Sequence, residues 1–182
     1  MIYKLIETRD DRNADRDVFY TDLGGWDHHS QLKDSIEPMF HRLNHGLELF
    51  VDQLKEVGLW DDVTIVVTSD FARTFTPNNN DGSDHAWGGQ YFMLGGSVNG
   101  GKVMGKYPDD MRPADSPLVT RNGGGRGRFI PTTSWDAVWN GVLEWMGVDS
   151  GAEMDYCLPN AANTVDTDKG FKIFSKDDLF VE

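Results

Sequence analysis

A long apolar stripe dominates the first half of the chain. From Leu32 onward, apolar residues recur every three or four positions as far as Val57. This spacing places them on one face of an α-helix, so we predict a long amphipathic helix. Gly58 is a natural stop. Pro38 sits near the start, where proline is tolerated best, so the regular helix is expected to begin around Glu37.

Three short runs have the composition of β-strands. Residues 18–21 are β-rich and lead into a glycine turn, residues 63–68 form a nearly continuous β-branched run, and residues 90–94 are followed by two glycines. The second run is typical of a strand buried on both faces of a parallel sheet. Because the long helix separates the first two runs, the order strand, helix, strand predicts an α/β fold.

A second helix is expected after Thr133, which would cap it with Asp136 three residues on. Its buried face would carry six apolar residues, interpreted as core: Trp135, Val138, Trp139, Val142, Trp145 and Met146. After residue 149 the chain reads as irregular, apart from a short edge strand at 171–174. We therefore predict one α/β domain over residues 1–182, with its core in 17–149 and a tail in 150–182.

Composition narrows the classes of partner. A net charge of −13 disfavours nucleic acid and anionic membranes, whereas clustered carboxylates suit divalent cations. The single cysteine excludes an intrachain disulfide and a cysteine-rich zinc module. No apolar run approaches the roughly 20 residues that span a bilayer, and the first residues lack the apolar segment of a signal peptide. A soluble protein with no visible compartment address is expected.

The first polar cluster follows the predicted strand at 18–21. Asp27 and His29 stand after two glycines that let the backbone turn sharply. At the carboxyl end of a parallel strand they would converge on the usual ligand site, which makes them candidate metal ligands. The alternative interpretation is that Asp27 caps the next helix while the histidines face solvent.

Two further clusters complete the candidate site. Asp70 lies just beyond the strand at 63–68, and Arg73 would either pair with it or grip an anionic substrate. In the glycine-framed loop at 82–89, His85 is a candidate ligand, and Asp84 is either a ligand or the carboxylate that orients an imidazole. Carboxylates and imidazoles from three separated segments are typical of mixed nitrogen and oxygen metal sites.

A glycine-rich stretch with two arginines occupies residues 122–128. It lacks the lysine and hydroxyl residue of a Walker loop, so a nucleotide loop is not supported. Two readings stay open, a positively charged lid over the metal site and an ordinary mobile loop.

The order of these motifs resembles a known family. Along the chain stand Gly-Gly-Trp-Asp-His-His at 24–29, the long helix, Val-Thr-Ser-Asp-Phe-Ala-Arg at 67–73, Gly-Ser-Asp-His at 82–85 and Phe-Met-Leu-Gly-Gly at 92–96. This ordered set resembles the carboxy-terminal half of the uncharacterised DUF1501 family, in the alkaline phosphatase and sulfatase superfamily, over roughly residues 17–149.

The resemblance implies a doubly wound, mostly parallel α/β sheet with helices on both faces, of which this chain holds an incomplete half. It also implies a divalent metal, with zinc first and magnesium, manganese or calcium as alternatives. Arg73 would contact the oxyanion of the substrate. The residues that would bind or surround the metal by this resemblance are Asp27, His29, Asp70, Asp84 and His85.

Two departures from the superfamily pattern stand out. Phe71 follows Asp70 where better-known members carry a histidine, so one imidazole ligand is absent. The nucleophile of the superfamily lies in its amino-terminal half, and neither Ser30 nor Ser69 matches that motif. Another segment or chain would have to supply it.

These features predict a metal-dependent, hydrolase-like protein that acts on phosphate or sulfate esters, with an anionic ester as substrate. The alternative is a non-catalytic metal-binding or assembly module. A half-sheet exposes an edge and an apolar face, so either reading predicts a homo-oligomer or a partner chain that completes the sheet.

Overall fold

The computed structural model describes residues 1–112, 119–120, 125–149, 151–164 and 171–181. In chain order, its helices and strands are α1 (Ile2–Glu7), the 3₁₀ turn η1 (Asp10–Arg12), α2 (Leu32–Glu56), η2 (Trp60–Asp62), β1 (Thr64–Val67), β2 (Ala72–Arg73), β3 (His85–Ala86), β4 (Phe92–Gly95), β5 (Val119–Thr120), β6 (Arg128–Phe129), α3 (Trp135–Trp145), α4 (Gly151–Cys157), η3 (Ala161–Thr164) and α5 (Lys176–Leu179).

The predicted doubly wound parallel sheet is wrong for the described residues. The strands there form three separate antiparallel pairs, β1 with β4, β2 with β3, and β5 with β6. Residues 18–21 form no strand, and Val18 and Tyr20 are 82% and 88% exposed. A β-rich run without a neighbouring strand has no partner for its backbone groups, so its composition alone does not make it a strand.

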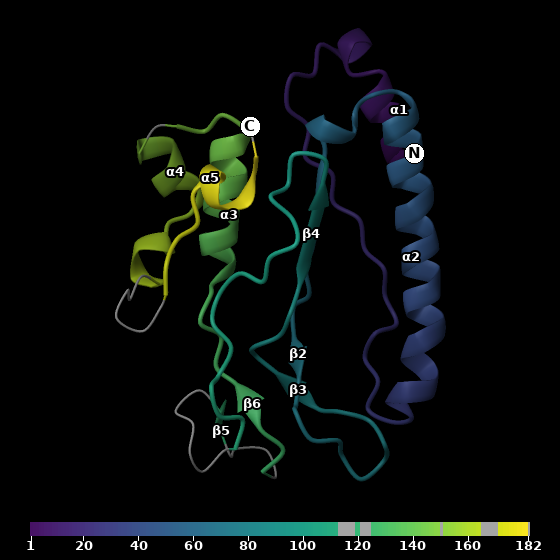
Figure 1. Cartoon of the computed structure of the whole chain (residues 1–182), viewed down its shortest axis with the longest axis vertical. Coiled ribbons are helices and arrows are strands. Elements are labelled where there is room, and N and C mark those ends of the chain that lie inside the picture. The colour runs from purple at the N-terminus through teal and green to yellow at the C-terminus, as the bar shows by residue number, and fades with distance from the viewer. Residues whose placement is uncertain (113–118, 121–124, 150, 165–170, 182) are drawn as a thin grey trace.

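The ribbon of β1 and β4 forms the middle of the molecule (Figure 1). Residues Val66 and Met93 are paired across it and pack against the hydrophobic core beside α3. Side chains alternate between the two faces of a strand, so Phe92 and Leu94 point the other way, toward α2. Every residue of β1 is only half-buried, which corrects the prediction of a strand buried on both faces.

Helix α2 confirms the long amphipathic helix, but it begins at Leu32 rather than near Glu37 and includes Pro38. Gly58 follows the helix with a φ of +70°, the left-handed conformation that suits a glycine after a helix end. Leu54 is the one residue of α2 that is fully buried, and much of the apolar stripe stays open to solvent.

The tail is more regular than the sequence indicates. Phe174, predicted to lie in an edge strand, is instead buried in the core, and its backbone N–H donates to the Ala137 carbonyl of α3 over 3.1 Å. Helix α5 packs on α3, and Phe180 stacks on Trp145 with ring centroids 4.8 Å apart. The cap of α3 is Ser134, one residue later than expected. The part of the tail from Phe174 to Phe180 therefore belongs to the core.

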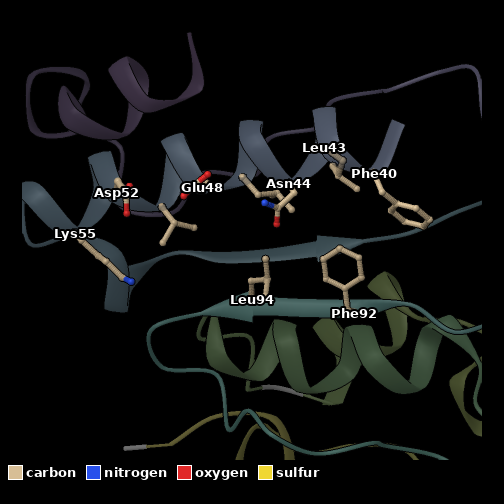
Figure 2. A pocket seen from close by; sticks show the side chains of 10 residues that line it. Phe40, Leu43, Asn44, Glu48, Asp52, Lys55, Phe92 and Leu94 are labelled. Atoms are coloured by element: carbon tan, nitrogen blue, oxygen red, sulfur yellow. The ribbon is translucent and has the colours of Figure 1, made fainter. Parts of the chain in front are cut away.

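An apolar groove separates α2 from β4 (Figure 2). Its volume is about 590 Å³. The residues that line it are Phe40, Leu43, Asn44, Leu47, Glu48, Val51, Asp52, Lys55, Phe92 and Leu94. Within the described ranges, no helix combines the length and apolar character needed to cross a bilayer.

Candidate functional site

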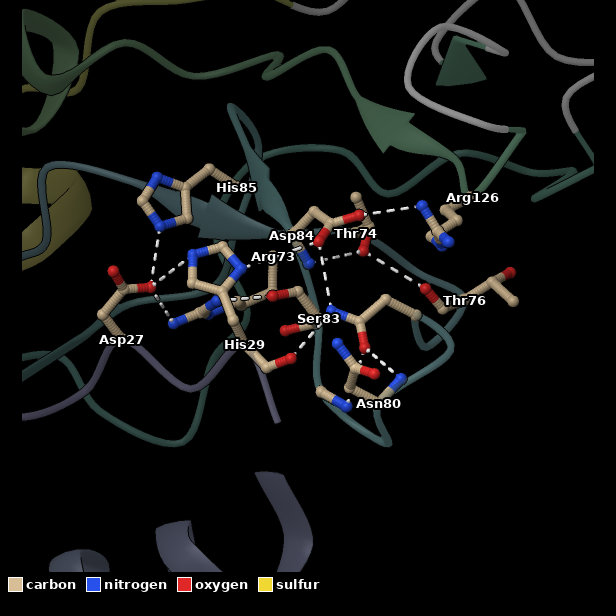
Figure 3. A network of polar contacts seen from close by, with 12 residues as sticks. Asp27, His29, Arg73, Thr74, Thr76, Asn80, Ser83, Asp84, His85 and Arg126 are labelled. Atoms are coloured by element: carbon tan, nitrogen blue, oxygen red, sulfur yellow. Dashed lines mark hydrogen bonds and ion pairs between the residues drawn. The ribbon is translucent and has the colours of Figure 1, made fainter. Parts of the chain in front are cut away.

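Two segments that are distant in sequence build the candidate site. One is the extended stretch before α2, which carries Asp27 and His29. The other is the hairpin of β2 and β3, in which Arg73 pairs directly with His85. Residues opposite each other in an antiparallel pair project on the same face, so both side chains point toward Asp27 (Figure 3).

Backbone hydrogen bonds join the first segment to the hairpin loop. The Leu32 N–H donates to the Asp81 carbonyl over 2.9 Å, and the Ser83 N–H donates to the His28 carbonyl over 3.2 Å. Between these bonds lies Gly82, where a Cβ atom would sit 2.1 Å from the carbonyl carbon of His29. Only glycine lets the two backbones approach so closely.

Asp27 is the centre of the cluster. Its Oδ1 atom lies 2.8 Å from His85 Nε2 and 3.1 Å from His29 Nε2, and it accepts a 3.0 Å hydrogen bond from Arg73 Nη2. The hydrogen bond with His85, followed by that with Arg73 and the charge of His29, lowers the pKa of the Asp27 carboxyl from its usual value, although desolvation opposes the shift. Asp27 is therefore held as a carboxylate, the form that binds a cation.

Asp84 lies behind His29. Its Oδ1 atom is 3.6 Å from His29 Nδ1 and accepts a 3.1 Å bond from Asn78, while its Oδ2 atom accepts a 3.0 Å bond from Arg126. The hydrogen bond from Asn78 is the main cause that lowers the pKa of Asp84, and the charges of Arg126 and His29 lower it further. Desolvation opposes this shift. This geometry matches the carboxylate that orients an imidazole rather than a direct ligand.

Aromatic stacking fixes the plane of the His85 ring. Phe71 stacks on it with ring centroids 4.0 Å apart and planes 9° apart, and the His29 ring lies 5.0 Å away with its plane tilted by 28°. Arg73 lies over the Phe71 ring, 4.7 Å from its centroid. Phe71 thus supports the ring of a candidate ligand.

The structure brings three of the five predicted metal-site residues together and leaves Asp70 and Asp84 outside that group. One ligand atom from each of Asp27, His29 and His85 lies within 4.8 Å of the other two, and this is the only such group of three among the described residues. Asp70 is exposed and does not belong to it. Its charge instead acts on Tyr91, whose pKa is raised mainly by burial and secondarily by Asp70.

Arg73 forms an ion pair, as one of its two readings predicts, but with Asp27 in place of Asp70. It also donates to the carbonyls of Ser83 and Trp26 over 2.8 and 2.7 Å. Its guanidinium therefore ties the hairpin to the first segment. The oxyanion contact stays a prediction.

Sequence reasoning missed two supporting residues. Asn78 was expected only as part of a loop, yet its side-chain amide donates to the His29 carbonyl as well as to Asp84. Arg126 was considered as part of a lid, and its contact with Asp84 spans 42 positions of sequence. The sequence offers only a weak signal for Arg126. It is an arginine in an acidic chain, and the glycines beside it let the backbone come close to another segment.

The three converging side chains offer the donor types that zinc takes, one carboxylate oxygen and two imidazole nitrogens. Zinc takes His nitrogen and carboxylate oxygen at about 2.0–2.2 Å, and two ligands of a tetrahedral site are therefore roughly 3.3 Å apart. The distances of 2.8 and 3.1 Å from Asp27 to the two imidazoles are slightly shorter than this, and the two imidazole nitrogens lie within 4.8 Å of each other. Three protein ligands with an open fourth position are the pattern of catalytic zinc sites.

Comparison with known proteins gives one match. Residues 6–121 match the family described as protein of unknown function (DUF1501). This range is more than half of the chain. No curated protein and no solved structure matches it. The matched range contains Asp27, His29, Arg73, Asp84 and His85. The chain therefore belongs to the DUF1501 family.

Proposed function

We propose that this chain binds a divalent metal, zinc first, as part of a hydrolase-like protein of the phosphatase or sulfatase type. The observation that carries the proposal is the convergence of Asp27, His29 and His85 from two segments of the chain. Magnesium, manganese and calcium are the alternatives, but two imidazoles among three ligands favour zinc because the harder ions prefer oxygen.

The wider relationship to the alkaline phosphatase and sulfatase superfamily is part of this proposal. Its support is the order of the Asp-x-His and Asp-His segments along the chain. A bound metal would polarise a phosphate or sulfate ester at the open ligand position. Around it, Asp84 would orient His29 and Arg73 would hold Asp27, with a contact to the substrate oxyanion as the further prediction for Arg73.

The nucleophile is expected from another segment or another chain. Of the two hydroxyls near the clusters, Ser69 already donates to the Phe71 carbonyl over 2.9 Å, and neither it nor Ser30 has the superfamily motif. An anionic ester is the expected substrate because a metal and Arg73 would offset the acidic charge of the chain locally.

Zinc titration by calorimetry, followed by hydrolysis assays, tests the proposal. The purified chain should bind one zinc ion, and His85→Ala should remove binding. His41→Ala is the matched control, because His41 is an exposed histidine on α2 that does not belong to the ligand group. Equal zinc binding by both variants, or none by the parent chain, would overturn the metal site.

Activity needs a separate assay with nitrophenyl phosphate and nitrophenyl sulfate. The metal-loaded chain should release nitrophenol faster than the His85→Ala variant. Zinc binding without any ester hydrolysis in the presence of its native partners would refute the hydrolase assignment and leave the metal site in place.

The open groove favours a second candidate function, a non-catalytic assembly module. In the described part of the chain, β1 and β4 pair only with each other, and the apolar faces of α2 and β4 meet in the groove. Its rim carries both signs of charge, Glu48 and Asp52 beside Lys55, so a second copy could pair them. The proposed occupant is therefore a second copy of this chain.

Sedimentation equilibrium tests this candidate. The chain should be a dimer at micromolar concentration, and Leu43→Lys should make it monomeric. Leu49→Lys is the control, since Leu49 lies on α2, is 53% exposed and does not line the groove. A monomeric parent chain, or a dimer that survives Leu43→Lys, would contradict self-assembly through this groove.

A further inference from the structure

A short stretch ending in β6 lies against the metal-site hairpin. The Thr76 N–H donates to the Arg126 carbonyl over 2.9 Å, and the Phe75 N–H donates to the Gly127 carbonyl over 3.0 Å. On the other arm, the Gly88 N–H donates to the Phe129 carbonyl over 2.9 Å. The stretch 126–129 is thus hydrogen-bonded to both arms of the hairpin that carries the site.

Two arginines on this stretch contact successive residues of the site. Arg126 donates to the Asp84 carboxylate over 3.0 Å, and Arg128 donates through Nε to the His85 carbonyl over 2.8 Å. One arginine holds a side chain and the other holds the backbone beside it.

The contact with Arg126 places Asp84 against His29. Arg126 occupies one carboxylate oxygen, and the other oxygen faces His29 Nδ1 at 3.6 Å and accepts from Asn78. The side chains of Arg126 and Asp84 are 26% and 28% exposed, so water screens this pair less than a surface ion pair. With both oxygens engaged, the carboxylate has little freedom to turn away from the imidazole.

We propose that Arg126 is a positioning residue for the metal site, which acts by fixing Asp84 against His29 and thereby sets the orientation of that imidazole. The effect of Arg126 on metal affinity rests on the proposed function. The orientation of His29 itself does not, because the contacts that fix it join residues of the chain alone. Partners behind a ligating histidine typically change metal affinity by about 10- to 100-fold when they are removed.

The first test needs no metal. The rings of His29 and His85 lie 5.0 Å apart, so their ring protons should give a nuclear Overhauser cross-peak in the parent chain. Arg126→Met should weaken that cross-peak, and Arg126→Lys should restore most of it by keeping a charge near Asp84. Arg42→Met is the control, because it removes an exposed arginine of α2 that belongs neither to the hairpin nor to the stretch 126–129. Circular dichroism would check that each variant folds.

A double-mutant cycle on zinc affinity provides the second test. Arg126→Met and Asp84→Asn should each weaken zinc binding about tenfold or more, and the double variant should be no weaker than Asp84→Asn alone, since Arg126 acts through Asp84. A purely structural role for Arg126 would instead give additive losses.

The two tests separate the inference from the proposed function. A parent chain that binds no zinc refutes the metal site, while a weakened cross-peak in Arg126→Met still supports the positioning of His29. An unchanged cross-peak in folded Arg126→Met, or additive losses of zinc affinity, overturns the role of Arg126 even where zinc binds.

Discussion

The contact between the two backbones at Gly82 predicts a large effect from adding one methyl group. In Gly82→Ala the new Cβ atom would lie 2.1 Å from the carbonyl carbon of His29, and ordinary contact begins at 3.4 Å, so the backbones must separate by about 1.3 Å. Three hydrogen bonds of 3.2, 3.1 and 2.9 Å join these backbones, donated by Ser83, Gln31 and Leu32. A separation of that size would break them.

At about 1 kcal/mol for each hydrogen bond, the loss is about 3 kcal/mol of unfolding free energy. Urea unfolding followed by circular dichroism would measure it. Gly24→Ala is the matched control, since Gly24 lies in the same extended segment and has no atom within 4 Å of an added Cβ. Both variants lose the same flexibility in the unfolded chain, so their difference isolates the clash.

Gly82→Ala should lower the affinity for zinc as well as the free energy of unfolding. Because the separation moves His29 away from Asp84 and His85, Gly82→Ala should also weaken zinc binding, while Gly24→Ala should keep it. The reasoning is refuted if Gly82→Ala unfolds within 1 kcal/mol of the control and binds zinc equally well.

Three further predictions concern stability. Gly46→Ala in the exposed middle of α2, with nothing within 4 Å of the new Cβ, should raise the unfolding free energy by about 0.5–1 kcal/mol in urea titrations; a loss would contradict the open environment at this position. Phe174→Ala should cost about 3–5 kcal/mol in the same assay, because its side chain is fully buried on α3, and a cost below 1 kcal/mol would place the tail outside the core. The hydrogen bond from Lys172 lowers the pKa of Asp178, so this carboxylate stabilises the fold above its unfolded pKa of about 3.9 and loses that contribution as the pH falls through the lower folded pKa. Melting curves of Asp178→Asn should therefore differ from the parent chain at pH 7 and converge with it in acid, and a constant difference would count against the ion pair.

Local patterns predicted the two longest helices, α2 and α3, but not α1, α4 or α5. The spacing of apolar residues from Leu32 to Val57 determines a helical face without reference to any other segment, and α2 confirms it. The start of the helix was misjudged because Pro38 is usually found in a first turn, whereas here the chain accepts it in the second. The cap at Ser134 differed by a single residue, which is within the normal fraying of helix ends.

Strand pairing could not be predicted in the same way. The run at 63–68 and the run at 90–94 are strands, but their composition does not say whether they pair with each other or with distant strands. They form an antiparallel ribbon, so the expected parallel sheet is absent from the described residues. Phe174 shows the same limit, because the short run at 171–174 places an aromatic residue in the core without forming one of the paired strands.

The pairing of the strands also decides which of the predicted ligands come together. Asp27, His29 and His85 converge because the hairpin and the first segment are joined by backbone hydrogen bonds. Asp70 is a candidate because it directly follows the strand at 63–68, which is expected to lie in a parallel sheet beside the strand that leads to Asp27. Since β1 pairs antiparallel with β4, that argument does not apply, and Asp70 lies outside the group.

Zinc titration of three forms of the chain tests the central claim most directly. The parent chain and Asp70→Ala should each bind one zinc ion with similar affinity, and Asp27→Ala should bind none, because Asp27 is the carboxylate on which both imidazoles converge. Loss of binding in Asp70→Ala with retention in Asp27→Ala would contradict the assignment, and so would a parent chain that takes up no zinc.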